Sequence, residues 1–211
     1  MNHFKVVIHS HSEKSFDATI SLKRWCSLIS KYQISHIILT EHNNLDSYLR
    51  LKEIVNNRNL EVQVIPACEY TTSVGDIIVL FHDKLIEFSD YKDLIHKAKN
   101  KGALIALPHP SKRSEYPIDL INNLSLYEIL NLRRSSKNNF DNRLFNKIPF
   151  FFGSDAHNWI DLPGCINHYY SDKSDLKEIL LNEVPIPSIH RLELNILNKI
   201  SKGISKLKRL K

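Results

Sequence analysis

The sequence predicts an α/β protein whose strands form a parallel sheet, closed or nearly closed into a barrel. Short apolar runs alternate with amphipathic stretches along most of the 211 residues, as expected where helices cover both faces of a parallel sheet. There are about seven or eight such runs, enough strands to close a barrel. Barrels of this kind carry their chemistry at the carboxyl ends of the strands, so the polar residues there are the candidates for function.

The predicted strands are short and apolar, and most are separated by segments with helical periodicity. The strands are expected at Phe4–Ile8, His36–Thr40, Val62–Cys68, Ile77–Phe81, Ala103–Leu107, Leu126–Leu130, Phe150–Phe152 and Ile166–Tyr170. The helices are expected at Ile20–Tyr32, Leu45–Asn56, Tyr91–Asn100, Lys137–Phe145 and Leu176–Leu181. Lys101-Gly102 is a typical helix end. The segment from Tyr70 to Asp76 lies between two strand runs and predicts a hairpin.

The composition is that of a globular protein with a sizeable core, at 42% hydrophobic and 25% charged residues. No apolar stretch is long enough to cross a membrane, and nothing resembles a signal peptide, so we expect no integral membrane association. The three cysteines, Cys26, Cys68 and Cys165, are too widely spaced for a zinc knot and are expected to be buried free thiols. A reducing cytoplasm fits this usage.

The positive charge is concentrated at the end of the chain. Between Ser188 and Lys211 there are seven Lys and Arg residues and one acid, Glu193, which accounts for the whole net charge of +6. We therefore divide the chain into a barrel domain, residues 1–187, and a basic amphipathic C-terminal helix, residues 188–211. The helix is predicted by apolar residues at three- and four-residue steps: Ile189, Leu192, Ile196, Ile200, Ile204 and Leu207.

Three interpretations of this C-terminal helix stay open. It could close the barrel with its apolar stripe and keep a solvated basic face. It could dock onto nucleic acid or another anionic partner. It could lie in a membrane interface, although its apolar face has no Trp or Phe.

Several predicted strands end in His, Asp or Glu. His9 and His11 follow the first strand and point to the same side of it. Two imidazoles on one side are costly to bury without a partner, and a metal ion is such a partner. The later strand ends carry the same residue types, in Glu41-His42-Asn43, Glu69, His109 and Asp155-Ala156-His157. If these strand ends lie on one rim of the barrel, their side chains would converge on one site.

The residue types narrow the chemistry of this site. Imidazoles mixed with carboxylates, without thiolates, suit Zn, Mn or Fe. There are more candidate ligands than one ion needs, and a carboxylate such as Glu69 can bridge two ions. Multi-metal clusters of this kind activate a water molecule and neutralise phosphoryl oxygens. No Ser-His-Asp elbow, Walker loop or dinucleotide fingerprint competes with this interpretation.

The ordered motifs resemble those of the PHP family, the polymerase and histidinol phosphatase superfamily. The motifs are His9-Ser-His11, Thr40-Glu-His42-Asn43, Ala67-Cys-Glu69, Leu107-Pro-His109-Pro110 and Gly153-Ser-Asp155-Ala-His157. Together they span residues 5 to about 160. The resemblance implies a distorted (β/α)7 barrel, a trinuclear metal site at the carboxyl ends of the strands, and hydrolysis of phosphoesters.

The resemblance also implies how the ligands are shared among the ions. His9 and His11 would hold one ion with Glu69 and Asp155, and Glu69 would bridge to a second ion held by His109. Asp17, His42 and His157 would hold the third. We expect Glu69, His109 and Asp155 to act directly in catalysis, with two to three ions of Mn, Zn or Fe. Glu41 stands where the family usually has Asp, outside the ligand set.

One further ligand of the second ion has two candidates. Asp76 faces Glu69 across the predicted hairpin, and His82 ends the same strand. We favour Asp76 and keep His82 as the alternative.

Other polar residues near the strand ends have a supporting or a neutral interpretation. Glu128 and Asn131 could hydrogen-bond the ligands, or could belong to a buried strand with a capping Asn. Four cations could meet a phosphate at the rim, or be solvated loop charges: Lys112, Arg113, Arg133 and Arg134.

The function expected is that of a metal-dependent phosphoesterase, either a phosphomonoesterase or a nuclease. Its substrate would be phosphorylated, and the basic C-terminal helix slightly favours nucleotides or nucleic acid. The alternatives are a small-molecule phosphatase of the histidinol phosphate type and a non-catalytic PHP module within a larger complex. A protein partner is therefore also open.

Overall fold

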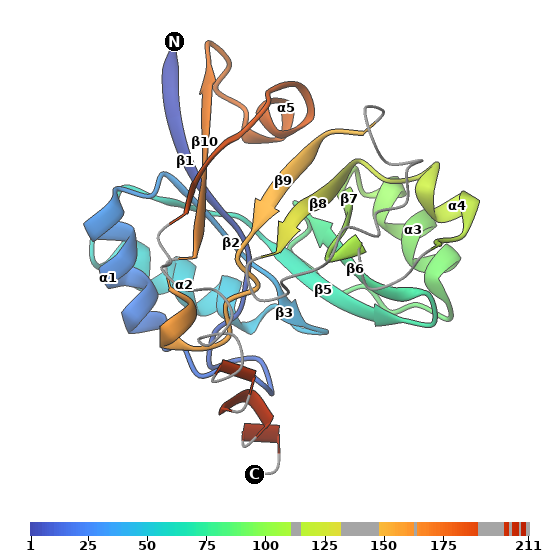
Figure 1. Ribbon diagram of the computed structural model, residues 1–211, viewed down its shortest axis with the longest axis horizontal. Helices are drawn as coiled ribbons and strands as arrows, with labels where there is room; N and C mark the ends of the chain where they lie inside the picture. The colour runs from blue at the N-terminus through green and yellow to red at the C-terminus, as the bar shows by residue number, and fades with distance from the viewer. Residues whose placement is uncertain are drawn as a thin grey trace.

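The computed structural model describes residues 1–110, 115–131, 148–162, 164–189, 201–202, 204–206 and 208–209, and the strands among them form two sheets (Figure 1). The five-stranded sheet has the order β11-β10-β1-β2-β4 and the six-stranded sheet the order β3-β5-β6-β7-β8-β9. The strands are β1 Asn2–Ser10, β2 His36–Leu39, β3 Glu41–His42, β4 Gln63–Val64, β5 Ala67–Thr72, β6 Gly75–Leu80, β7 Leu104–Leu107, β8 Leu126–Asn131, β9 Phe150–Gly153, β10 Cys165–Ser171 and β11 Ile186–Ile189.

All eight predicted strands are present, but the predicted parallel sheet is found only in part, because the two sheets mix parallel and antiparallel pairs. The predicted hairpin is confirmed: β5 and β6 are antiparallel, with Thr72 opposite Gly75. The tight turn between them reverses the chain, so β6 is also antiparallel to β7. At the other end of the fold β10 is antiparallel to both β1 and β11. The predicted strand Val62–Cys68 is split around Pro66, which has no N–H to donate to a sheet.

The described pairings do not form a single closed barrel, although the two sheets are joined at two places. Only Thr40 separates β2 from β3, so the chain passes directly from one sheet to the other there. On the opposite side, Ser10 and Ala156 form an isolated parallel bridge. Beside it, the Asp155 N–H donates to the His9 carbonyl over 2.8 Å. Both joints lie at the ends of strands that carry the candidate ligands.

The helices cover the outer faces of the two sheets. Helices α1 (Leu22–Tyr32) and α2 (Asp46–Asn57) lie on one side, and α3 (Tyr91–Asn100) and α4 (Ile118–Ile121) lie on the other (Figure 1). Helix α1 starts at Ser21, whose side chain accepts from Arg24 N, and α3 starts at Asp90 in the same way. Gly102, at φ 67°, follows the end of α3 as expected.

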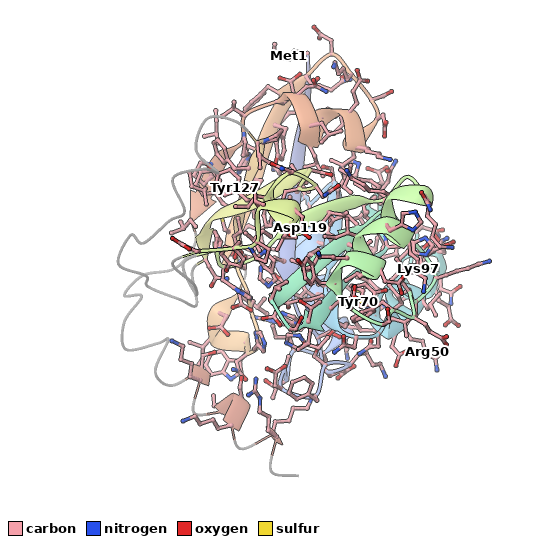
Figure 2. All side chains as sticks on the ribbon, turned by 90° about the vertical axis from the view of Figure 1, so that its right-hand side faces the viewer. Met1, Arg50, Tyr70, Lys97, Asp119 and Tyr127 are labelled. Atoms are coloured by element: carbon pink, nitrogen blue, oxygen red, sulfur yellow. The ribbon has the colours of Figure 1, made fainter. Side chains whose placement is uncertain are left out.

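One apolar cluster lies between the sheets and receives side chains from both. Its members include Ile8 of β1, Ile38 of β2, Ile78 of β6 and Phe151 of β9, each fully buried. Helix α5 (Leu176–Asn182) packs against the same cluster through Leu176, Ile179 and Leu180. Side chains at the surface contrast with this interior: Arg50 and Lys97 lie at the outer edge of the molecule in Figure 2, whereas Tyr70 is 2% exposed.

Some sequence expectations fall outside the described residues. These are the helix Lys137–Phe145, the cations Lys112, Arg113, Arg133 and Arg134, and residues 190–200 of the predicted C-terminal helix. Residues 201–202, 204–206 and 208–209 are helical, as the apolar periodicity predicts. The expected start of this helix at residue 188 is wrong, because Ser188 and Ile189 belong to β11 and pair with β10. All three cysteines are buried and unpaired. In the described part of the chain, no helix is long and apolar enough to span a membrane. The cytoplasmic location stays a prediction.

The side chain of Asn167 in β10 holds the two sheets together at a third place, away from the strand ends that carry the candidate ligands. It accepts from Phe152 N over 2.8 Å, donates to Phe152 O over 2.9 Å, and also donates to Val6 O over 3.3 Å. Asn167 is fully buried, so it replaces backbone pairing between β9 and β10 where no ladder exists.

We therefore expect Asn167→Leu to lower the free energy of unfolding by about 2–3 kcal/mol, because it leaves the partly buried N–H and carbonyl of Phe152 without their partner. Chemical denaturation followed by circular dichroism measures the change. The matched control is Asn56→Leu on the exposed surface of α2, which should change stability by less than about 0.5 kcal/mol. Equal stabilities for the two variants would contradict this role of Asn167.

Candidate metal centre

The candidate ligands come from strand ends on both sheets. His9 is the penultimate residue of β1, and His42 ends β3. In the parallel register of β3 and β5, His42 stands opposite Glu69. His109 follows β7 by two residues, and Asp155 follows β9 by two. The joints between the sheets thus bring together side chains that are far apart in the sequence.

Three of these residues have backbone conformations that are unusual for residues with a side chain. His9 has φ 59°, His109 has φ 34° and Asp155 has φ 47°. The left-handed region is unfavourable for residues other than glycine and is found most often at functional sites. Here it turns the side chains of the strand ends inward at the point where the strands stop.

The first cluster consists of four side-chain atoms that face one point. His9 Nε2 lies 3.5 Å from Glu69 Oε2 and 3.6 Å from Asp155 Oδ1. His11 Nε2 lies 3.3 Å and 3.5 Å from the same two oxygens. All four side chains are buried, at 0–3% exposure. The nitrogens of His9 and His11 and the Glu69 oxygen have no hydrogen-bond partner, although they are fully shielded from water.

These separations fit a metal ion better than direct hydrogen bonds. Ligand atoms set tetrahedrally at about 2.0–2.2 Å from a Zn²⁺ ion lie about 3.3–3.6 Å apart. Hydrogen bonds between nitrogen and a carboxylate are shorter, at about 2.7–2.9 Å. Buried polar atoms without partners are also costly, and an ion between them would satisfy them all at once. The residues present therefore fit a divalent cation.

A second cluster shares the Glu69 carboxylate. Its other oxygen, Oε1, lies 3.1 Å from His109 Nε2. Asp76 Oδ2 lies 3.7 Å from the same nitrogen. The ligand atoms of His9, Glu69 and His109 all lie within 4.8 Å of one another. Glu69 therefore faces two groups of ligands, one with each oxygen, as a bridging carboxylate would.

The third cluster surrounds Asp17. Its Oδ2 lies 3.2 Å from His157 Nε2, and its Oδ1 lies 3.6 Å from His42 Nε2. His42 Nδ1 lies 3.5 Å from Glu69 Oε2, which connects this cluster to the first. The ligand atoms of His11, His42 and His157 also lie within 4.8 Å of one another. The structure thus brings all nine sequence-predicted ligands into one region.

The two candidates for the remaining ligand lie at opposite ends of β6. Asp76 is its second residue and contacts the His109 ring, whereas His82 follows the last residue of the strand by two positions. Asp76 also lines the cavity above the clusters, and His82 does not. The geometry favours Asp76, because the carboxyl end of antiparallel β6 points away from the site.

Glu128 and Asn131 contact the ligands, which supports the first of their two interpretations. Glu128 Oε1 lies 2.8 Å from His9 Nδ1, and Asn131 Nδ2 donates to Asp155 Oδ2 over 3.3 Å. The Glu128 carboxylate needs the N–H of His9 Nδ1, which leaves Nε2 to present its lone pair to the cluster. A Cβ at Gly153 would lie 1.5 Å from Glu128 Oε1, so only glycine leaves room for this carboxylate.

Other buried contacts fix the loop that carries His11 and Asp17. Glu41 Oε1 accepts from the Ser12 N–H over 2.8 Å and from the Ser47 hydroxyl. Trp25 Nε1 donates to the His11 carbonyl over 3.2 Å. Glu41 therefore supports the loop from outside the ligand set, as the resemblance to the PHP motifs implies.

The site is electrostatically arranged for positive charge between its carboxylates. Burial alone would lower the pKa of His9, but Glu128, Glu69 and Asp155 raise it well above its ordinary value. Burial likewise opposes protonation of His11, whose pKa the neighbouring Asp155 and Glu69 nevertheless raise to about 9. Burial alone would raise the pKa of Glu69, but His9 and the neighbouring imidazoles hold it well below its ordinary value. Deprotonated carboxylates are the form that binds metal.

The third cluster behaves in the same way. Burial alone would raise the pKa of Asp17, but His157, Arg209 and His42 hold it well below its ordinary value. Burial, together with the charge of His11, lowers the pKa of His42. A neutral imidazole and an ionised carboxylate are the ligand forms of these side chains.

The sequence interpretation missed a buried polar network that docks the C-terminal helical residues beside the site. Asn158 Nδ2 donates to Ser201 O over 2.8 Å and to Ser205 Oγ over 3.2 Å. Asp161 Oδ2 accepts from Ser201 Oγ over 2.6 Å and from the His157 N–H over 3.0 Å. Asn158 and Asp161 have the spacing of a capping box, which was the only available sequence signal.

The helical residues also contact the loop that carries Asp17, as Figure 1 shows at the lower end of the molecule. The Lys208 ammonium donates to the carbonyls of Glu13, Ser15 and Ala18, over 3.1 Å and 2.7 Å for the first two. Arg209 Nη2 lies 2.6 Å from Asp17 Oδ2. The division of the chain at residue 187 stays a prediction, but the described part of the C-terminal segment is integrated into the site.

A cavity of about 340 Å³ opens above the three clusters. Its lining comprises Phe16, Asp17, His42, Glu69, Thr71, Asp76, His109, Asp155, His157, Lys202, Ser205, Lys206 and Arg209. A volume of this size suits a small organic ligand. The candidate ligands are therefore accessible to a substrate from this side.

Comparisons with known proteins agree with the motifs. The sequence pattern of the PHP domain matches residues 8–161. Among solved structures, the chain resembles a two-domain protein from Bacteroides vulgatus that contains a predicted PHP-like metal-dependent phosphoesterase, with TM-score 0.73, 18% identity, and 90% of this chain and 65% of that chain covered. The chain thus spans about two thirds of the length of that protein. No curated protein matches.

Two further solved structures share the fold. PsfC from Pseudomonas syringae has TM-score 0.62 and 17% identity, over 100% of this chain and 98% of that chain. A protein from Bifidobacterium adolescentis ascribed to the metal-dependent phosphoesterases has TM-score 0.56 and 11% identity, over 72% of this chain and 87% of that chain. At these identities the likeness concerns the fold alone. The matched pattern covers most of the chain and contains all nine clustered ligands, so this chain belongs to the PHP domain family.

Proposed function

We propose that the protein is a metal-dependent phosphoesterase that holds two to three divalent ions of Mn, Zn or Fe. One observation carries this proposal: four buried atoms of His9, His11, Glu69 and Asp155 face one point with N–O separations of 3.3–3.6 Å. A structural salt bridge would bring nitrogen and oxygen closer together. We also propose that the two sheets form the distorted barrel of the PHP family, because one apolar cluster receives buried side chains from both sheets.

The proposed ligand sets follow the three clusters. His9, His11, Glu69 and Asp155 would hold one ion, and Glu69 would bridge to a second ion held with His109 and Asp76. Asp17, His42 and His157 would hold the third. The ions would supply an activated water molecule and neutralise the phosphoryl oxygens.

The residues of the chain would orient this centre. Glu128 holds the His9 ring, and the Asp155 carbonyl lies 2.8 Å from His157 Nδ1, so Nε2 of both rings is directed to the clusters. Glu69, His109 and Asp155 line the cavity floor and would contact the reacting phosphoryl group through the ions. Their burial excludes competing water and strengthens every charge interaction at the reacting group.

The cavity favours a small phosphoester over a long nucleic acid. Its volume of about 340 Å³ suits a ligand of sugar or nucleotide size. Three cations of the C-terminal segment line this cavity, and a fourth, Lys208, is bound to backbone carbonyls, so these four cations contact the cavity or the backbone beside it. A nuclease activity and a protein partner stay open as proposals. The complete set of nine ligands argues against a non-catalytic module.

The first prediction of this proposal concerns metal content. Protein purified without chelator is expected to carry two to three ions of Mn, Zn or Fe per chain, because each of the three clusters offers at least three ligands. Elemental analysis of the purified protein measures the ratio. The Lys23→Glu variant, changed on the exposed face of α1, serves as a control and should hold the same metal. Less than one ion per chain, even after incubation with these metals, would exclude the trinuclear centre.

The second prediction concerns the shared carboxylate. Glu69→Gln keeps the shape of the side chain but removes its charge, so we expect at least about a hundredfold loss of phosphoesterase activity and a loss of bound metal. Activity is measured with p-nitrophenyl phosphate, metal by elemental analysis and folding by circular dichroism. Folded variant protein with near-normal activity would show that Glu69 does not bridge ions.

The third prediction separates Asp76 from His82. Asp76→Asn is expected to lower activity about tenfold to a hundredfold and to weaken metal binding, because Asp76 contacts the His109 ring. His82→Asn should leave both unchanged, since His82 lies beyond the other end of β6. The two variants are compared in the same hydrolysis assay and by metal titration. The opposite order of effects would assign the position to His82.

A further inference from the structure

Three cations from the C-terminal segment form one wall of the cavity above the candidate metal centre. Lys202, Lys206 and Arg209 line it together with the acidic and imidazole side chains of the floor. We call these three residues the cationic wall. Its members are spaced by four and three residues, which places them on one face of a helix. The wall and the metal ligands thus belong to one cavity although the sequence separates them widely.

The wall is held in place by buried contacts that do not involve its own charges. Ser201 is fully buried and Ser205 is 2% exposed, and both accept from Asn158 Nδ2. Lys208 is fixed by the carbonyls of residues 13–18 on the other side. The side chains between these anchors, Lys202 and Lys206, are exposed toward solvent at the cavity. Positioned cations on an anchored helix are suited to binding an anion.

Part of the wall's charge is engaged with the floor. Arg209 pairs with Asp17, and its guanidinium lies 5.1 Å above the ring of Phe16. These two contacts hold the guanidinium at the edge of the third cluster. Lys206 and Lys202, about one and nearly two turns earlier, extend the positive charge from that edge along the cavity.

We propose that the cationic wall binds a second phosphate group of the substrate, while the first phosphate is hydrolysed at the metal centre. This inference rests on the proposed phosphoesterase function and assigns the substrate to the small organic bisphosphates. A single phosphate at the metal centre would have its charge neutralised there. Lys202 and Lys206 extend the positive charge of the same small cavity beyond the Arg209–Asp17 pair, and this charge matches a second anionic group on the same molecule.

Two other interpretations of the wall make different predictions. The cations could only offset the negative charge of the floor, in which case removing one would affect every substrate alike. They could instead track the backbone of a nucleic acid, in which case a long single strand would bind much more tightly than any small ester. A matched pair of substrates, together with a single-stranded oligonucleotide, separates these two interpretations from the proposed second phosphate site.

The test compares glucose 1,6-bisphosphate with glucose 6-phosphate, which share a skeleton and differ by one phosphate. With the metal-loaded, full-length protein we expect a KM at least about tenfold lower for the bisphosphate, as one charge-assisted contact of moderate strength would give. Lys206→Ala should raise the KM of the bisphosphate severalfold and Lys206→Glu more, with kcat unchanged. Neither variant should change the KM of glucose 6-phosphate. Lys23→Glu, outside the cavity, controls for the change in net charge.

Some outcomes would overturn the proposal. Equal KM values for the two esters, or variants that change both esters equally, would assign the wall to charge neutralisation. Tighter binding of a single-stranded oligonucleotide than of the bisphosphate would assign it to nucleic acid. If neither ester is hydrolysed, the proposed function fails for sugar phosphates, and calorimetric binding of the same two compounds to wild type and Lys206→Glu still tests the wall. Equal affinities of the wild-type protein for the two esters in that measurement would exclude a second phosphate site at the cationic wall.

Discussion

The functional part of the structure depends on one buried carboxylate, that of Glu69. It is 1% exposed and lies 3.1–3.5 Å from nitrogen atoms of four imidazoles, those of His9, His11, His42 and His109. A buried charge among so many polar rings is unfavourable unless cations compensate it. The two joints between the sheets serve this arrangement, because they bring the ends of β1, β3 and β9 to Glu69 in β5. A divalent cation is the simplest partner that satisfies the carboxylate and the rings together.

The strand endings of the site were predictable from the sequence because they are local. A buried strand that stops in His, Asp or Glu is visible in a single sequence, and all nine predicted ligands come together in the structure. The hairpin of β5 and β6 was predictable for the same reason, since its turn has only two residues between the strands. The choice of Asp76 over His82 followed from that hairpin, but the expected register was wrong: Asp76 stands opposite Thr71, and Ile78 stands opposite Glu69. Asp76 still lies on the same face as Glu69, because each is two residues from the other's partner. The strand endings and the hairpin need only the order of residues and the geometry of a strand. Asp17 and the grouping of the ligands came instead from the resemblance to the PHP family.

The features that the sequence did not predict depend on long-range pairing. Nothing in β10 indicates that it runs antiparallel to β1, since both strands read as ordinary apolar runs. The Asn167 side chain, which replaces a missing ladder between β9 and β10, looks in the sequence like any polar residue in a strand. Left-handed backbone at His9, His109 and Asp155 was also invisible, because His and Asp adopt this conformation at only a small fraction of their positions. Such conformations persist only where the surrounding fold imposes them.

The C-terminal segment shows why periodicity and charge alone do not decide a role. The pattern correctly predicts helical residues, but a basic amphipathic helix can seal a core, bind nucleic acid or lie on a membrane. What decides between these roles is the buried network of Asn158, Asp161, Ser201 and Ser205, which directs one face of the segment to the cavity. Lys208 and Arg209 differ by one position, yet one binds backbone carbonyls and the other a candidate ligand. An anion that contacts both the floor and the wall would bind only the docked arrangement, so its binding would stabilise that docking by mass action. The same cations would then contribute to substrate selection and to the integrity of the site.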